Sequence, residues 1–93
     1  IVKATTRGEA PRISPVLSGE ELTAFQGLVR RVPVADGVVE FAVQLAARTR
    51  RGTPGGLGEL VSWGAGPRAS QYLVLGAKAH ALLRGKLSPD RED

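Results

Sequence analysis

One arginine stands where the electrostatics of a helix disfavours it. Arg68 falls in the first turn of a helix expected over residues 67–84, directly after the segment Gly64-Ala65-Gly66-Pro67. Cations are favoured near the carboxyl end of a helix, because the aligned peptide dipoles leave partial positive charge at the amino end. A guanidinium beside the free N–H groups of that amino end is, however, well suited to phosphate oxygens. The residues alone leave a phosphate-binding arginine and a tolerated surface arginine equally open.

The other chemically active residue types offer little to an enzyme acting alone. The one histidine, His80, lies in an apolar helical stretch without an acidic residue at helical spacing, so we interpret it as packed, with one hydrogen-bonded nitrogen. The chain has no cysteine, and no spacing suggests a metal site or a nucleophile–base pair. The glycine-rich stretch 52–58 lacks the final Gly-Lys-Ser/Thr of a P-loop and is interpreted as a flexible connection. No metal centre is expected.

Size and composition indicate one small domain. The chain has 93 residues, of which 42% are hydrophobic, 24% charged and only 4% aromatic. Such a core must be built mainly from Leu, Val and Ala, which suits closely packed helices. No apolar run approaches the roughly 20 residues needed to span a bilayer, and the start lacks a signal-peptide pattern. We therefore expect a cytoplasmic protein without a membrane span.

The net charge of +4 raises the question of nucleic-acid binding. The cations, however, gather where predicted helices end, and interaction with the exposed carbonyls there accounts for most of the excess. These cations are Arg30, Arg31, Arg48, Arg50, Arg51, Arg84 and Lys86. Nucleic acid is accordingly an unlikely partner, although a free-standing basic helical module that binds nucleic acid or a protein remains the alternative reading.

Local signals predict three main helices, over residues 19–32, 36–50 and 67–84. Ser18 and Glu21 have the spacing of a capping box, and Pro33 ends the first helix. Pro67 suits the first position of the third helix, and Gly85 is a natural stop. Ser88-Pro89-Asp90 resembles the cap of a fourth, truncated helix.

Two segments connect or flank these helices. Residues 57–63 are ambiguous between a short helical turn and an extended piece that tucks Leu60 and Trp63 against the bundle. Residues 1–17 are read as a linker with the tail of a preceding helix, and 18–93 as the domain. The fold class predicted is all-α, a small helical bundle.

Several stretches, in order along the chain, resemble the C-terminal lid domain of MoxR-type AAA+ ATPases. The most specific is the Gly-x-x-Pro-Arg motif at Gly64, Pro67 and Arg68. The others are Leu17-Ser18-x-Glu20-Glu21-Leu22 within 15–22, the runs 29–36 and 45–50, Ala77-Lys78-Ala79-x-Ala81-Leu82-Leu83-x-Gly85-Lys86, and Ser88-Pro89-Asp90. The resemblance extends over the whole chain, and single pieces of it are weak.

The resemblance implies a sensor 2 role for Arg68, which would contact the γ-phosphate of ATP. Pro67 would fix where the helix begins, and Gly66 stands where the family usually has Ser, so a side-chain cap is lost at a cost of a few tenths of a kcal/mol. The implied partners are the AAA+ core domain of the same chain and neighbouring subunits in a ring. ATP, with Mg²⁺ held by that core, is the implied cofactor.

The same resemblance implies that the chain is part of a larger, chaperone-like ATPase that remodels client proteins. The Walker motifs and the arginine finger are absent from these 93 residues, so this segment alone should not hydrolyse ATP. The client, the ring size and the subunit whose nucleotide Arg68 would contact are left open. A further possibility is that the segment mediates oligomer contacts only, with a structural Arg68.

Overall fold

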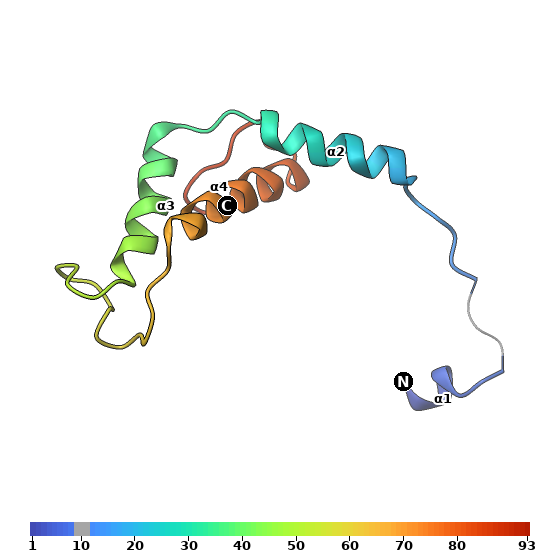
Figure 1. Ribbon diagram of the computed structural model, residues 1–93. Coiled ribbons are helices and arrows are strands. Elements are labelled where there is room, and N and C mark those ends of the chain that lie inside the picture. The colour runs from blue at the N-terminus through green and yellow to red at the C-terminus, as the bar shows by residue number, and fades with distance from the viewer. Residues whose placement is uncertain (9–11) are drawn as a thin grey trace.

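The described residues of this computed structural model, 1–8 and 12–93, form four α-helices and no strand (Figure 1). The helices are α1 (Val2–Thr5), α2 (Gly19–Arg31), α3 (Asp36–Arg48) and α4 (Pro67–Leu83). The all-α prediction is therefore confirmed. The three long helices begin and end within two residues of the expected 19–32, 36–50 and 67–84. Part of the expected linker, residues 9–11, lies outside the described residues.

The beginning of α2 is fixed by the predicted capping box. The Glu21 backbone N–H donates to Ser18 Oγ at 3.1 Å, and the Ser18 backbone N–H donates to Glu21 Oε2 at 2.8 Å. That backbone donor stabilises the carboxylate and lowers the pKa of Glu21. The helix ends before Pro33, where Val32 adopts an extended conformation with φ −60° and ψ 125°.

The boundaries of α4 follow from a proline and a glycine. Pro67 occupies the first turn after the cap residue Gly66, which has no side chain to satisfy a free N–H. At the other end, Gly85 has φ +74°, a left-handed conformation that favours glycine. Its N–H donates to Leu82 O at 3.0 Å, and the Lys86 N–H donates to Ala81 O at 2.8 Å, which is the Schellman pattern of helix termination.

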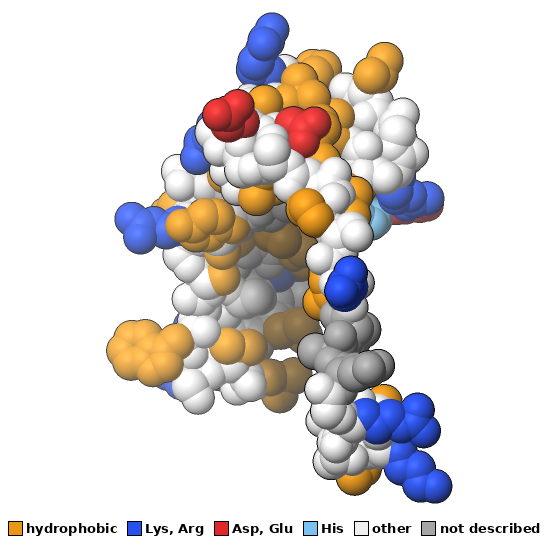
Figure 2. Space-filling view, turned by 90° about the vertical axis from the view of Figure 1, so that its right-hand side faces the viewer, with side chains coloured by type: hydrophobic (Ala, Val, Ile, Leu, Met, Phe, Trp, Pro, Cys, Tyr) orange, Lys and Arg blue, Asp and Glu red, His pale blue; other side chains and the backbone are white. Residues whose placement is uncertain are grey.

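Helix α4 packs against both α3 and α2, as Figure 1 shows. Among the described residues, buried hydrophobic side chains are few and small: Val32, Ala42, Ala46 and Ala81. Helix α2 buries none of its residues. The radius of gyration is 19.5 Å, against about 12 Å for a compact chain of this length, in part because α1 lies far from the other helices (Figure 1). The helices therefore form an open arrangement, and Figure 2 shows hydrophobic side chains at several places on the surface.

Of the two alternatives left open for residues 57–63, the extended piece that tucks Leu60 and Trp63 against the bundle is wrong. Their exposed fractions are 84% and 90%. Residues 57–60 form a turn closed by the Leu60 N–H on Leu57 O at 2.9 Å, while the Leu57 N–H donates to Arg48 O at 2.7 Å. The loop thus lies against the end of α3 through its backbone, and this leaves the two large side chains in solvent.

The expected fourth helix does not form within residues 84–93. Ser88 does not cap it; instead its hydroxyl donates to Pro33 O at 3.3 Å, and Pro89 is buried. The cap-like hydrogen bonds belong to Asp90. Its Oδ1 accepts from the Glu92 N–H at 2.9 Å, and its own N–H donates to Asp93 Oδ2 at 2.9 Å.

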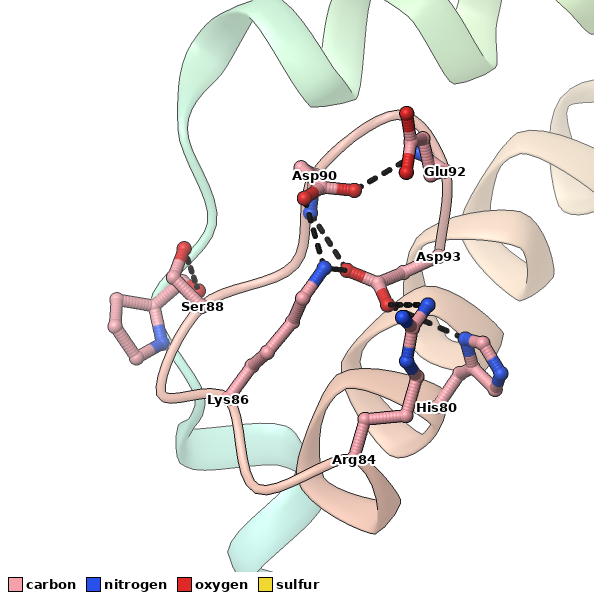
Figure 3. Close-up of polar contacts among 8 residues, drawn as sticks. His80, Arg84, Lys86, Ser88, Asp90, Glu92 and Asp93 are labelled. Carbon is pink, nitrogen blue, oxygen red and sulfur yellow. Dashed lines mark hydrogen bonds and ion pairs between the residues drawn. The ribbon is translucent and has the colours of Figure 1, made fainter.

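A polar cluster around Asp93 holds this terminal segment on the end of α4 (Figure 3). Lys86 Nζ donates to Asp90 Oδ2 at 2.8 Å and to Asp93 Oδ2 at 2.9 Å. On the other carboxylate oxygen, Oδ1, His80 Nδ1 lies at 3.2 Å and Arg84 Nη1 at 3.8 Å. The Asp93 side chain is fully removed from solvent. The Asp90 N–H, then Lys86 and His80, lower the pKa of Asp93 to about 2.

His80 has the one hydrogen-bonded nitrogen that the sequence suggested, but it is not packed. Its side chain is 48% exposed, and an acidic residue does face its ring. That acid is Asp93, which lies 13 positions further along and reaches the ring only because the chain turns back after Gly85.

We expect Ser18→Ala to lower the free energy of unfolding by about 1 kcal/mol, because the capping acceptor for the Glu21 N–H is lost. Urea denaturation followed by circular dichroism measures this change. Ser62→Ala is the matched control, since Ser62 is exposed and its hydroxyl makes no hydrogen bond within the described residues. Equal stability of the two variants would contradict a capping role for Ser18.

Low pH should release the terminal segment from the end of α4, because the Asp93 carboxylate becomes protonated. Because its folded-state pKa is about 2 and its ordinary value 3.8, its contribution to stability is fully present above pH 3.8. That contribution is lost as the pH falls through 2. We expect Asp93→Asn to destabilise the chain near neutral pH and to flatten the fall in stability between pH 4 and pH 2. Urea titrations across that range measure both effects.

Glu92→Gln is the control for this titration, because the Glu92 carboxylate makes no hydrogen bond or ion pair within the described segment. A pH profile of Asp93→Asn that parallels the parent profile would rule out Asp93 as the titrating group.

Candidate functional site

The loop that leads into α4 is held by two residues at the end of α3. The Ala65 N–H donates to Thr49 Oγ1 at 2.8 Å, and Arg50 Nε donates to Ala65 O at 2.8 Å. Thr49 follows the last residue of α3, and its hydroxyl donates to Ala46 O at 2.7 Å. Both polar groups of the Ala65 backbone are thus bound by side chains that come 15 and 16 positions earlier.

Gly64 allows this close approach. A Cβ atom at Gly64 would lie 2.8 Å from Arg50 Cα and 2.8 Å from the Thr49 carbonyl oxygen. Both are backbone atoms that cannot swing aside, so a larger residue would push the loop away from α3. The close packing of the loop against the end of α3 therefore requires glycine at the first position of the Gly-x-x-Pro-Arg motif.

The structure places the three predicted site residues consecutively at the beginning of α4. Gly66 is the cap, Pro67 opens the helix, and the Ala69 N–H closes the first turn on Gly66 O at 3.0 Å. Arg68 is exposed, and its guanidinium makes no hydrogen bond or ion pair with any residue that the structure describes. Open space lies beside Gly66, so its lack of a side chain is not a packing requirement.

A groove of about 750 Å³ runs beside this helix start. Helix α4 contributes Pro67, Ser70, Gln71, Val74 and Leu75; Arg30, Val39, Val43 and Arg50 complete the lining. Arg68 is not a lining residue. Its spacings of three and seven to Gln71 and Leu75, two lining residues, place it on a neighbouring part of the helix surface.

Sequence reasoning assigned Arg30 and Arg50 to helix ends and gave Thr49 no role. Both arginines do lie at or just beyond the carboxyl ends of α2 and α3, as expected. Their convergence on one groove depends on how the helices pack, and no local pattern signals it. The Thr49 hydrogen bond to Ala65 spans 16 residues and has no signature in the sequence either.

No helix in the described part of the chain has both the length and the apolar character needed to cross a membrane.

Comparisons with known proteins give one significant similarity among curated sequences. The chain is 30% identical over 79 residues to Chaperone MoxR1 of Mycobacterium tuberculosis. The matched region is 82% of this chain and 21% of that protein, so the chain spans about a fifth of the length of the curated relative. No family model matches the chain, and no solved structure resembles it significantly. The similarity indicates a relation to MoxR proteins.

Proposed function

We propose that this chain is the C-terminal lid domain of a MoxR-like AAA+ ATPase and that Arg68 is its sensor 2 residue. The observation that carries the proposal is the position of Arg68: exposed, without a partner in the described residues, and in the first turn of a helix whose start is tied to α3. The 30% identity to Chaperone MoxR1 supports the family context.

The chemistry proposed for Arg68 is recognition of the γ-phosphate of ATP. A guanidinium binds phosphoryl oxygens through two N–H donors at once and offsets charge that develops during transfer. Arg30 and Arg50 add positive charge to the groove that α4 lines. Because the γ-phosphate leaves on hydrolysis, its contact with Arg68 would link the chemical step to the position of the lid.

The residues present fit a triphosphate but not its metal ion. Arg68 lies in the first turn of α4, Arg30 and Arg50 line the groove beside this helix, and no acidic side chain lines that groove. Mg²⁺ would therefore be held by the AAA+ core, whose Walker residues would also orient the attacking water and make the main phosphate contacts. Pro67 and Gly66 would set the direction from which Arg68 reaches the nucleotide.

The open packing supports partners that cover the helices. Leu22, Phe25 and Leu28 of α2 have exposed fractions of 51%, 52% and 44%. Contiguous apolar surface of this kind marks an interaction face. We propose that the AAA+ core of the same chain and neighbouring subunits of a ring cover it, in a cytoplasmic machine that remodels client proteins.

The alternative, a free-standing basic module that binds nucleic acid, has less support. Basic residues close the last turns of α2 and α3, where the helix dipole accounts for them. Figure 2 shows Lys and Arg at separated places on the face it presents. Binding to duplex DNA that weakens steeply with added salt would nevertheless favour this alternative.

We expect Arg68→Ala in the full-length protein to lower kcat for ATP hydrolysis about ten- to hundredfold. This range corresponds to the roughly 1.5–3 kcal/mol of a hydrogen bond to a charged group. Steady-state ATP turnover of the assembled protein measures it. Arg68→Lys should recover only part of the rate, because an ammonium group cannot make the bidentate contact.

Arg31→Ala is the matched control. Arg31 is an exposed arginine and, unlike its neighbour Arg30, it does not line the groove. Its turnover should equal that of the parent protein. Normal turnover by a folded, assembled Arg68→Ala protein would exclude the sensor assignment.

A further inference from the structure

We propose that Thr49 and Arg50 act as positioning residues for Arg68, through their hydrogen bonds to the backbone of Ala65. We call this pair of contacts, Thr49 Oγ1 with the Ala65 N–H and Arg50 Nε with Ala65 O, the α3–α4 latch. The catalytic consequence of the latch rests on the proposed function of Arg68, whereas its effect on the loop does not.

The Thr49 hydroxyl both donates and accepts a hydrogen bond. It donates to Ala46 O at 2.7 Å and accepts from the Ala65 N–H at 2.8 Å. The residue is half-buried, so water competes less with these bonds than at the surface. Because the donor proton is committed to Ala46, the oxygen lone pairs face the loop, and the geometry at Ala65 is defined from the end of α3.

The latch is the principal polar tie on the second half of the loop. The first half is held by backbone bonds, such as the Leu57 N–H on Arg48 O at 2.7 Å. Between residues 61 and 66, within the described chain, the backbone N–H groups make no hydrogen bond to another backbone group. The large side chains nearby do not anchor the loop, since Trp63 is 90% exposed.

Two residues, Gly66 and Pro67, separate the latch from Arg68, and both belong to the start of α4. Gly66 is the cap of α4, Pro67 fixes its φ angle, and the Ala69 N–H closes the turn on Gly66 O at 3.0 Å. Fixing Ala65 therefore fixes the axis and rotation of the first turn. The position of Arg68 is thereby set by α3, the helix against which α4 packs.

The hydrogen bond from Arg50 orients the loop more than it stabilises it. Its side chain is exposed, so its bond to Ala65 O competes with water. Its guanidinium nevertheless also lines the groove beside Pro67. One arginine thus ties the loop through Nε while it adds positive charge beside the helix that carries Arg68.

The test uses the full-length protein with Thr49→Val, which keeps the branched shape but removes the acceptor. Hydrogen–deuterium exchange of the Ala65 amide should become at least tenfold faster. The fold decrease in kcat for ATP hydrolysis should be larger than the fold change in KM for ATP. Thr49→Ser should restore both values, because the hydroxyl returns.

Thr53→Val is the matched control. Thr53 is also half-buried and its hydroxyl donates to Ala47 O at 2.9 Å, but it makes no hydrogen bond to the segment 61–66. Exchange at Ala65 and ATP turnover should remain at parent values in this variant.

A double mutant separates positioning from general structural damage. If the latch acts through Arg68, Thr49→Val should cause little further loss of kcat in an Arg68→Ala background. An equal loss in both backgrounds would overturn the positioning role, and so would unchanged exchange at Ala65 in Thr49→Val. Faster exchange in Thr49→Val, combined with normal turnover of Arg68→Ala, would support the latch as a tie on the loop but refute the sensor function.

Discussion

The packing of α4 against α3 is the interaction on which the rest of the structure depends. Buried alanines on both helices, Ala42 and Ala46 on α3 and Ala81 on α4, permit a close approach. Small side chains contribute little apolar area each, so the stabilisation from this core is modest. Its main effect is geometric, because it brings the end of α3 next to the loop before α4, where side-chain hydrogen bonds can form.

The small number of buried side chains explains why the helices form an open arrangement. With so few buried hydrophobic side chains in the described residues, the chain keeps apolar faces in solvent, including most of α2. Hydrophobic surface of this extent is unfavourable in an isolated domain and favourable in one that docks on a larger body. The terminal segment is held differently, by charge: the buried carboxylate of Asp93 gathers Lys86, His80 and Arg84 around the end of α4.

Local interactions made much of the fold predictable. The capping box at Ser18, the proline at position 67 and the Schellman turn at Gly85 each involve residues within a few positions of one another. The same reasoning left two alternatives open around Trp63 and failed at Ser88. Their local patterns suggested packing against the bundle and a helix cap, but the backbone of the loop and the carbonyl of Pro33 offered competing contacts from distant positions.

The sequence by itself determined the helices, their ends and the presence of an arginine in the first turn of α4, because backbone sterics and neighbouring hydrogen bonds decide these features. Only the tertiary structure decided which groups meet that turn. The bonds from Thr49 and Arg50 to Ala65, and from His80 to Asp93, join residues 13 to 16 positions apart. Such contacts form only after the chain has folded back on itself, and residue spacing alone does not specify them.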